Sequence, residues 1–255
     1  MPVVKEEEEK EEDPLAFVKD RISMDVRSGF CTDAEVLENA VQTAKVELGD
    51  KTAEPAVEEA VRRLVDAAVA EQVAREESWG MDRTDCDRLD EAFAVLEAEG
   101  ILAHQNYTCC QTCGTAEIHD QMAVAAAAGR QIKGYVFYHQ QDTQFAADGS
   151  GICLTYGGYI PATQEDEDDR RDENDGKEED EWEDVDEEAD KVVRASAAVA
   201  IGRRVVSALK VAGLKVKWNG NLNKRIEVRL DWRRRRATLA QRPATSEAVP
   251  AARAA

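Results

Sequence analysis

Apolar residues recur at helical spacing through the first hundred positions of this chain. Thr32 and Glu35 lie three residues apart in a capping-box pattern at one expected helix start, and Thr84 is placed to cap another. Glycines follow several of the apolar stripes and indicate where these helices stop. The pattern predicts four helices, over about 17–28, 33–46, 54–77 and 85–99.

From Ile101 onward the helical period gives way to short runs that are typical of strands. The last two runs alternate between apolar and polar residues around a turn rich in Asn and Gly, which predicts a hairpin. Two helical segments, 117–128 and about 191–213, lie between the runs. The expected strands are 101–103, 135–138, 152–156, 214–218 and 226–232. The sequence therefore predicts an α+β fold, with N-terminal helices followed by a small mixed sheet of about five strands and two covering helices.

The net charge of −20 is concentrated in two acidic runs. Residues 5–13 carry −5 and residues 165–190 carry −15, so the rest of the chain is close to neutral. Runs of like charge with few apolar anchors do not gain enough from burial to fold. We expect a disordered acidic tail over 1–13 and a disordered insert over 162–190. They flank and interrupt a single domain, 14–236, with a helical part (14–100) and a sheet-containing part (101–236), and a second disordered tail covers 237–255.

Composition also bounds the compartment and the partners. The chain has no apolar run of about 18 residues and no basic segment leading into an apolar one, so we expect a cytoplasmic protein that does not enter membranes. The acidic insert would attract a basic partner and repel phosphate. Trp232 with the arginines at 233–236 resembles a nucleic-acid-binding patch, but the acidic surroundings make nucleic acid an unlikely partner.

Three of the six cysteines fall within five positions, as Cys109, Cys110 and Cys113. A C-x-x-C spacing is common in structural zinc sites, which need four ligands. We therefore predict a metal site formed by these three cysteines with His139, and zinc is the candidate ion. His104, His119 and Cys153 are other candidates for the fourth ligand.

The same cysteines are also compatible with roles that need no metal. Cys110 and Cys113 lie between an expected strand and an expected helix, where a dithiol redox pair would gain a lowered thiolate pKa. A cysteine could also act as a nucleophile with His139 and Asp142, although Asp142 is better placed to cap a short helix through residues 145–147. Buried cysteine can simply fill a core. Because adjacent residues of a strand face opposite sides, at least one of Cys109 and Cys110 should be accessible, unless the backbone turns there.

Five blocks occur in order along the chain: TDCDRLDEAF, NYTCCQTCG, GYVFYHQQDT, LTYGGY and AGLKVKWNGNLNKRIEVRLDWRRR. With these blocks, most of residues 14–236 resembles a mainly bacterial family of domains of unknown function. The long acidic insert after Tyr159 departs from that pattern. The resemblance implies one domain from the first helices to the final hairpin, and it implies no activity.

No catalytic motif stands out, and catalytic residues are unknown. The sequence favours a non-enzymatic intracellular binding or interaction domain, whose cysteine cluster is buried or zinc-bound and whose partner is a protein or a small ligand. The alternative is a thiol-dependent redox protein or enzyme that uses Cys110 and Cys113.

Overall fold

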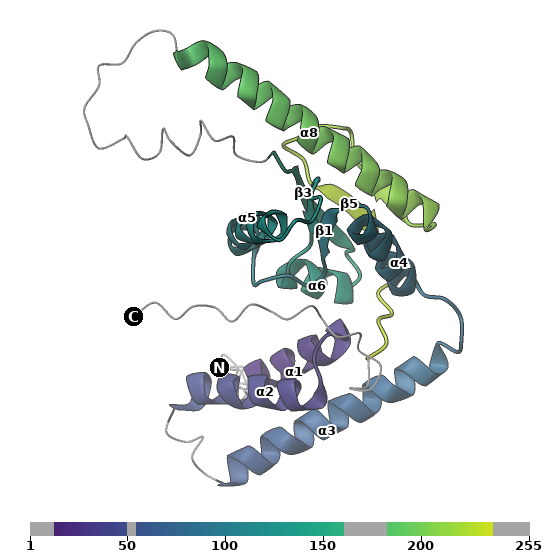
Figure 1. Ribbon diagram of the computed structural model, residues 1–255. Coiled ribbons are helices and arrows are strands. Elements are labelled where there is room, and N and C mark those ends of the chain that lie inside the picture. The colour runs from purple at the N-terminus through teal and green to yellow at the C-terminus, as the bar shows by residue number, and fades with distance from the viewer. Residues whose placement is uncertain (1–12, 50–54, 161–182, 237–255) are drawn as a thin grey trace, which may run out of the picture. The chain divides into compact units, whose positions relative to one another are not determined.

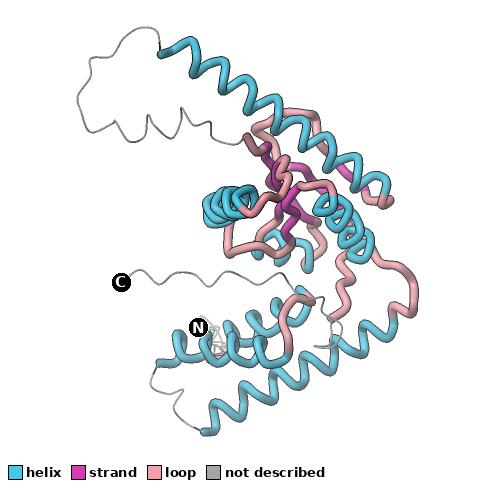
Figure 2. Tube along the Cα trace, viewed as in Figure 1, coloured by secondary structure: helices cyan, strands magenta, loops and turns pink. Residues whose placement is uncertain are grey.

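The computed structural model describes residues 13–49, 55–160 and 183–236, which form seven helices and five strands (Figure 1). Four helices come first, and strands and helices then alternate until a closing pair of short strands (Figure 2). This confirms the α+β class and the mixed five-stranded sheet. The described residues form two compact units, one of residues up to Met81 together with Arg234–Arg236, the other within Asp82–Arg233.

The helical unit contains α1 (Ala16–Ser28), α2 (Asp33–Leu48) and α3 (Pro55–Ser78). The predicted capping box is present at α2, where Thr32 Oγ1 accepts the N–H of Glu35 and the Glu35 carboxylate accepts the N–H of Thr32. The three helices share a core of small and β-branched side chains. Its members are Val18, Ile22, Val26, Val36, Ala40, Ala44, Val61 and Val65.

Three of the four consecutive arginines contact this helical unit. The Arg234 guanidinium lies 4.5 Å from the centroid of the Phe30 ring. Arg235 donates to the Gly80 carbonyl at 3.1 Å. The Arg236 side chain, only 9% exposed, donates to the Asp33 carboxylate at 2.7 Å. Cations that resemble a nucleic-acid-binding patch in the sequence therefore have partners within the chain.

The second unit holds the sheet, whose strand order is β1-β2-β3-β5-β4. β1 and β2 are parallel, and every other neighbouring pair is antiparallel, including the predicted hairpin of β4 and β5. The elements are α4 (Asp85–Ala98), β1 (Ile101–His104), α5 (Gln111–Ala127), β2 (Gly134–Phe137), α6 (Gln140–Ala147), β3 (Ile152–Gly158), α8 (Glu183–Val211), β4 (Lys215–Lys217) and β5 (Ile226–Arg229). Parallel neighbours need a crossover connection, so α5 begins at the sheet end where β1 and β2 both finish.

Helices cover both faces of the sheet (Figure 1). α8 packs on the face that carries Gly134 and Gly158, so closely that a Cβ at Gly134 would lie 2.7 Å from Ile201. α5 covers the opposite face, where Ile118 and Met122 join a core with strand residues of β2. The absence of side chains at the two glycines lets helix and sheet backbones approach one another.

Helix α4 belongs to the sheet-containing unit, although the helical pattern had grouped it with residues 14–100. Its apolar stripe, Leu89, Phe93 and Leu96, is buried, and the Phe93 ring meets the edge of Tyr138 at a centroid distance of 5.9 Å. The division between units therefore follows Met81. The sequence pattern identified the helix but could not show which core its apolar stripe enters.

Two helices begin earlier than the sequence pattern predicts. α5 starts at Gln111, six residues before the expected start. α8 starts at Glu183, so the last eight positions of the expected insert, 183–190, are helical. The acidic composition of that segment offers no hydrophobic period from which a helix could be predicted. Residues 162–182 and nearly all of the two expected tails lie outside the described residues.

No helix in the part of the chain that the structure describes is both long enough and apolar enough to cross a bilayer.

Replacing Gly134 by alanine should destabilise the sheet-containing unit. The new Cβ would lie 2.3 Å from the Gly157 carbonyl oxygen and 2.7 Å from Ile201, and such overpacking costs about 1–3 kcal/mol. Urea unfolding followed by tryptophan fluorescence measures the loss. The matched control is Lys133→Ala, an exposed neighbour that should change stability by less than about 0.5 kcal/mol. Equal stabilities of the two variants would contradict the close packing of α8 on the sheet.

Candidate metal centre

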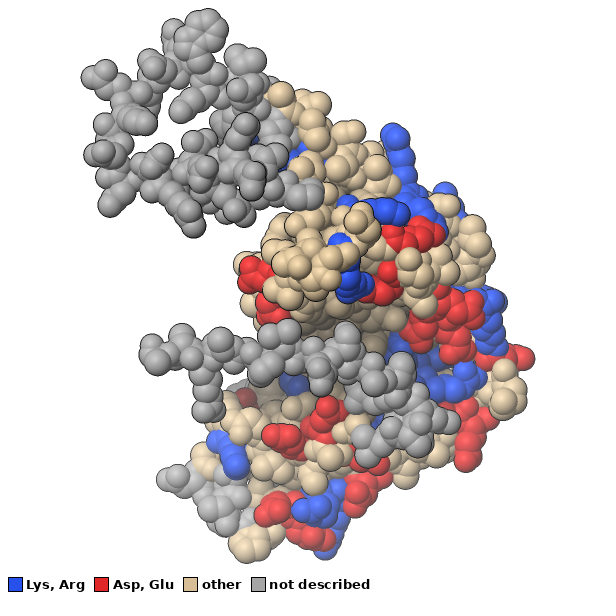
Figure 3. Space-filling model, in the orientation of Figure 1, with Lys and Arg blue, Asp and Glu red and all other residues tan. Residues whose placement is uncertain are grey.

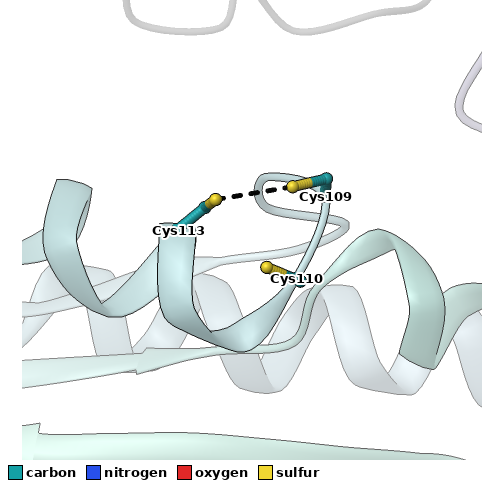
Figure 4. Close-up of side chains that lie close together, drawn as sticks. All are labelled: Cys109, Cys110 and Cys113. Carbon is teal, nitrogen blue, oxygen red and sulfur yellow. Dashed lines mark hydrogen bonds between the residues drawn. The ribbon is translucent and has the colours of Figure 1, made fainter.

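The three clustered cysteines lie where the loop after β1 turns into α5 (Figure 4). Cys109 and Cys110 are the last residues of the loop, and Cys113 lies in the first helical turn. Their sulfurs are all within 4.8 Å of one another, and the sulfurs of Cys109 and Cys113 are 3.5 Å apart. Cys109 and Cys113 are exposed and Cys110 is half-buried, so the expected accessibility of the adjacent pair is confirmed.

Backbone hydrogen bonds hold this loop against the end of β2. The N–H of Tyr107 donates to the Tyr138 carbonyl at 2.9 Å, and the N–H of Gln140 donates to the Thr108 carbonyl at 3.1 Å. The Tyr107 ring stacks on His104, with ring centroids 4.7 Å apart. The residues before the cysteines are therefore fixed on both sides, by the adjacent strand and by a packed ring.

Thr108, directly before the cysteines, has a left-handed backbone with φ of 53°. This conformation is unfavourable for a β-branched residue and persists only where its surroundings enforce it. The Thr108 hydroxyl donates to the Cys110 carbonyl at 3.1 Å, which closes the turn. Such strain is common at functional sites. Here it directs the chain so that two adjacent cysteines approach a third one on the following helix.

The start of α5 completes the cluster. Cys110 is the N-cap, and its carbonyl accepts the first helical hydrogen bond, from the N–H of Gly114 at 3.0 Å. A Cβ at Gly114 would lie 2.6 Å from the Phe137 ring of β2. Only glycine lets the first turn come this close to the strand. The position of Cys113 relative to the loop therefore depends on Gly114.

The two cysteines of the C-x-x-C pair differ in acidity. The N–H of Cys113, the sulfurs of Cys113 and Cys109, and the N–H of Thr112 lower the pKa of the Cys110 thiol. The sulfurs of Cys109 and Cys110 raise the pKa of Cys113 to about 11, because a second thiolate beside the first is unfavourable. One negative charge at the helix N-terminus is thus favoured over two.

The sulfur positions fit a thiolate metal site. A tetrahedral zinc ion with Zn–S bonds of about 2.3 Å needs sulfurs about 3.8 Å apart. The cluster offers separations from 3.5 Å up to at most 4.8 Å, so small side-chain rotations suffice. The three cysteines can supply three of four tetrahedral ligands. Cys109 and Cys113, both exposed, place the fourth position close to solvent.

The structure does not bring His139 into this group. His139 is the N-cap of α6, and its Nδ1 accepts the N–H of Asp142 at 3.3 Å. Its Nε2 lies 3.1 Å from the Asp142 carboxylate, which also accepts a hydrogen bond from Arg225. Both ring nitrogens are therefore engaged, and neither has a lone pair available for a metal or for activating a thiol. The sequence favoured Asp142 as the cap of a short helix, but the structure makes His139 the N-cap and places Asp142 in the first turn of α6, as the N3 partner of a capping box.

The other candidate ligands are not part of the sulfur group either. His104 stacks on Tyr107, and burial lowers its pKa. His119 is exposed on α5, with Nδ1 2.6 Å from the Thr115 carbonyl. Cys153 is half-buried on β3, and burial raises the pKa of its thiol. Among the described residues, the cluster is therefore a set of three sulfurs.

Comparison with known families identifies the chain. The family described as domain of unknown function (DUF6891) matches residues 9–179 and 181–236. The chain belongs to the DUF6891 family. This confirms the resemblance to a family of domains of unknown function over most of the chain. No curated protein and no solved structure matches the chain.

Three residues that shape this DUF6891 domain could not be assigned a role from the sequence. Thr108 and Gly114 flank the cysteines, and only the C-x-x-C-Gly run gave a hint that the backbone is crowded there. Arg225 lies 83 positions from the Asp142 carboxylate that it contacts. No local pattern predicts that contact, because the hairpin reaches α6 only in the folded sheet.

Replacing His139 by asparagine should weaken the acid sensitivity of the DUF6891 domain. Burial and Arg225 lower the pKa of His139 below its ordinary 6.5, while Asp142 opposes the shift. As the pH falls through about 6.5, the imidazole is protonated in the unfolded chain while it stays neutral in the folded chain. The contribution of His139 to the free energy of unfolding is therefore fully present above about pH 6.5 and decreases below it. Asparagine keeps a good N-cap but does not titrate.

Urea unfolding at pH 7.5 and pH 5.5 measures the difference between wild type and His139→Asn. The wild type should lose more stability between the two pH values than the variant does. His119→Asn, on an exposed side chain, is the control and should behave like wild type. An equal loss in His139→Asn and wild type would show that the cap does not favour the neutral ring.

Proposed function

We propose that the DUF6891 domain is a non-enzymatic binding domain that holds a thiophilic metal ion, with zinc as the first candidate, at Cys109, Cys110 and Cys113. The observation that carries the proposal is the convergence of three sulfurs within 4.8 Å of one another at one strand-to-helix turn. Thiolates select soft and borderline ions such as zinc. The strained, hydrogen-bonded loop supports the proposal, because it holds the ligands together before the ion arrives.

Exposure argues against a purely structural role for these thiols. A cysteine that fills a core is buried, as Cys86 is, and Cys31 and Cys153 are at least half-buried. Cys109 and Cys113 are exposed, so they contribute little to apolar burial. A metal ion would give the three side chains a reason to converge at the surface.

We also propose that the domain acts in the cytoplasm, where thiols stay reduced and available. Its partner is a protein or small ligand that reaches the exposed fourth position of the metal. The acidic run at 165–190 favours a basic protein. On the face shown in Figure 3, Lys and Arg are interspersed with Asp and Glu, which supports protein recognition over nucleic-acid binding.

The metal proposal predicts one zinc ion per chain. The substitutions Cys109→Ser, Cys110→Ser and Cys113→Ser should each weaken zinc binding, because each removes a ligand. The loss should exceed the roughly 10–100-fold that follows from removing a residue that only hydrogen-bonds to a ligand. Mass spectrometry of the eluted metal gives the stoichiometry, and competition with a chromogenic chelator gives the affinity. Cys153→Ser, outside the cluster, is the matched control and should bind like wild type. Unchanged affinity in all three cluster variants would refute the site.

A second candidate function is thiol–disulfide exchange by Cys110 and Cys113. Its support is the position of Cys110 at the N-cap of α5, where its pKa is lowered, with Cys113 one turn on. The Cys110 thiolate would attack a disulfide substrate and release one thiolate. Cys113 would then lose its proton and attack the mixed disulfide, releasing the second thiol and leaving a Cys110–Cys113 disulfide.

This second function predicts different pH dependences of alkylation in the reduced, metal-free chain. The Cys113 thiol, with a pKa of about 11, should react about tenfold more slowly for each unit of pH lost between 9 and 7. The Cys110 rate should fall less steeply, because its thiolate persists to lower pH. Substoichiometric iodoacetamide with peptide mass mapping measures both rates. Parallel slopes would exclude an asymmetric redox pair.

A further inference from the structure

Three sulfurs converge at the start of α5, and no other described His, Cys, Asp or Glu joins them. Resting on the metal-binding function proposed above, we propose that the cluster is a site for three-coordinate thiophilic ions, of which trivalent arsenic is the test case. A tetrahedral ion in this site must take its fourth ligand from outside the cluster. An ion with a lone pair in place of the fourth ligand needs only three sulfurs to fill its coordination sphere.

The positions of the donors carry this inference. Cys109 and Cys113 approach within 3.5 Å from opposite sides of the turn, and Cys110 lies below them at the N-cap (Figure 4). All three donors lie on one short, hydrogen-bonded segment, so one ion can contact them together without a change in the sheet. Soft thiolates favour soft ions, which strengthens the preference.

His139, the histidine that the sequence assigned to the metal site, is held by its own contacts. His139 Nδ1 accepts the N–H of Asp142, and its Nε2 faces the Asp142 carboxylate at 3.1 Å. The carboxylate is held in turn by Arg225. Turning His139 toward a metal would remove the cap of α6 and separate the imidazole from the buried Asp142 carboxylate. These contacts make His139 unavailable as a fourth ligand.

The binding step is an exchange without oxidation or reduction. Arsenite, As(OH)₃, meets three thiols, and three As–S bonds form as three As–O bonds break. Each thiol gives its proton to a leaving hydroxide, so three waters are released. The exposed sulfurs of Cys109 and Cys113 give the incoming ion access, and the half-buried Cys110 closes the third bond.

The test adds sodium arsenite to the zinc-loaded full chain. We expect one arsenic per chain, release of the bound zinc, and a native mass that exceeds that of the metal-free chain by one arsenic atom less three hydrogens. Protection of Cys109, Cys110 and Cys113 from alkylation should accompany binding, while Cys153 stays reactive when the chain is denatured. These readouts use the wild-type chain and do not depend on a variant folding.

Single substitutions test which sulfurs bind the arsenic. Cys109→Ser, Cys110→Ser and Cys113→Ser should each bind arsenite at least about 100-fold more weakly, whereas Cys31→Ser and Cys153→Ser should bind like wild type. Phenylarsine oxide needs only two thiols, so it should still bind the cluster variants and leave one cluster thiol free to alkylate in wild type. Arsenite binding that survives all three cluster substitutions would overturn the proposal.

Further results separate this inference from the proposed function. Zinc bound by the cluster but not displaced by arsenite would overturn the three-coordinate preference and leave the zinc site standing. Arsenic bound through two cysteines keeps one hydroxide, so its adduct is heavier by one water than the three-cysteine adduct, and this result would do the same. Arsenite bound by all three cysteines without any zinc affinity would support the inference and refute zinc as the resident ion. No binding of either would refute both.

Discussion

The anchoring of the β1–α5 loop to the end of β2 determines the chemistry of this domain. Parallel pairing of β1 and β2 requires a crossover, and the crossover helix α5 must start beside the carboxyl ends of both strands. Hydrogen bonds from Tyr107 to Tyr138 and from Gln140 to Thr108 then fix the loop at that edge. Gly114 against Phe137 fixes the helix start. Three cysteines within five positions converge because the backbone between them has so little freedom.

The same three converging sulfurs could support metal binding or thiol–disulfide exchange, but one molecule cannot do both at the same time. A metal held by three thiolates leaves no free Cys110 to attack a disulfide, and a disulfide between cluster cysteines leaves too few ligands for a metal. The lowering of the Cys110 pKa by its neighbouring donors favours both, since metal ligation and nucleophilic attack each need the thiolate. The preference for metal binding follows from Cys109, a third sulfur 3.5 Å from Cys113 for which a dithiol pair has no use.

The sequence predicted those features that depend on local pattern. The Thr32–Glu35 capping box, the closing hairpin and the placement of C-x-x-C between a strand and a helix each reflect neighbouring residues, and each is present. The early start of α5 was missed because Gln111–Gly114 is a weak helix-forming segment that gains its place by packing on Phe137. The engagement of His139 could not be foreseen, because it needs Arg225 from a hairpin distant in sequence.

X-ray absorption at the zinc edge of the loaded, full-length chain tests the central claim most directly, because it counts the sulfur ligands. The account predicts three sulfurs at about 2.3 Å and one lighter oxygen or nitrogen ligand from outside the cysteine cluster. The Cys109→Ser variant should show two sulfurs. A shell of four sulfurs, or of two sulfurs with two histidine nitrogens in the wild type, would contradict a centre built from Cys109, Cys110 and Cys113 alone.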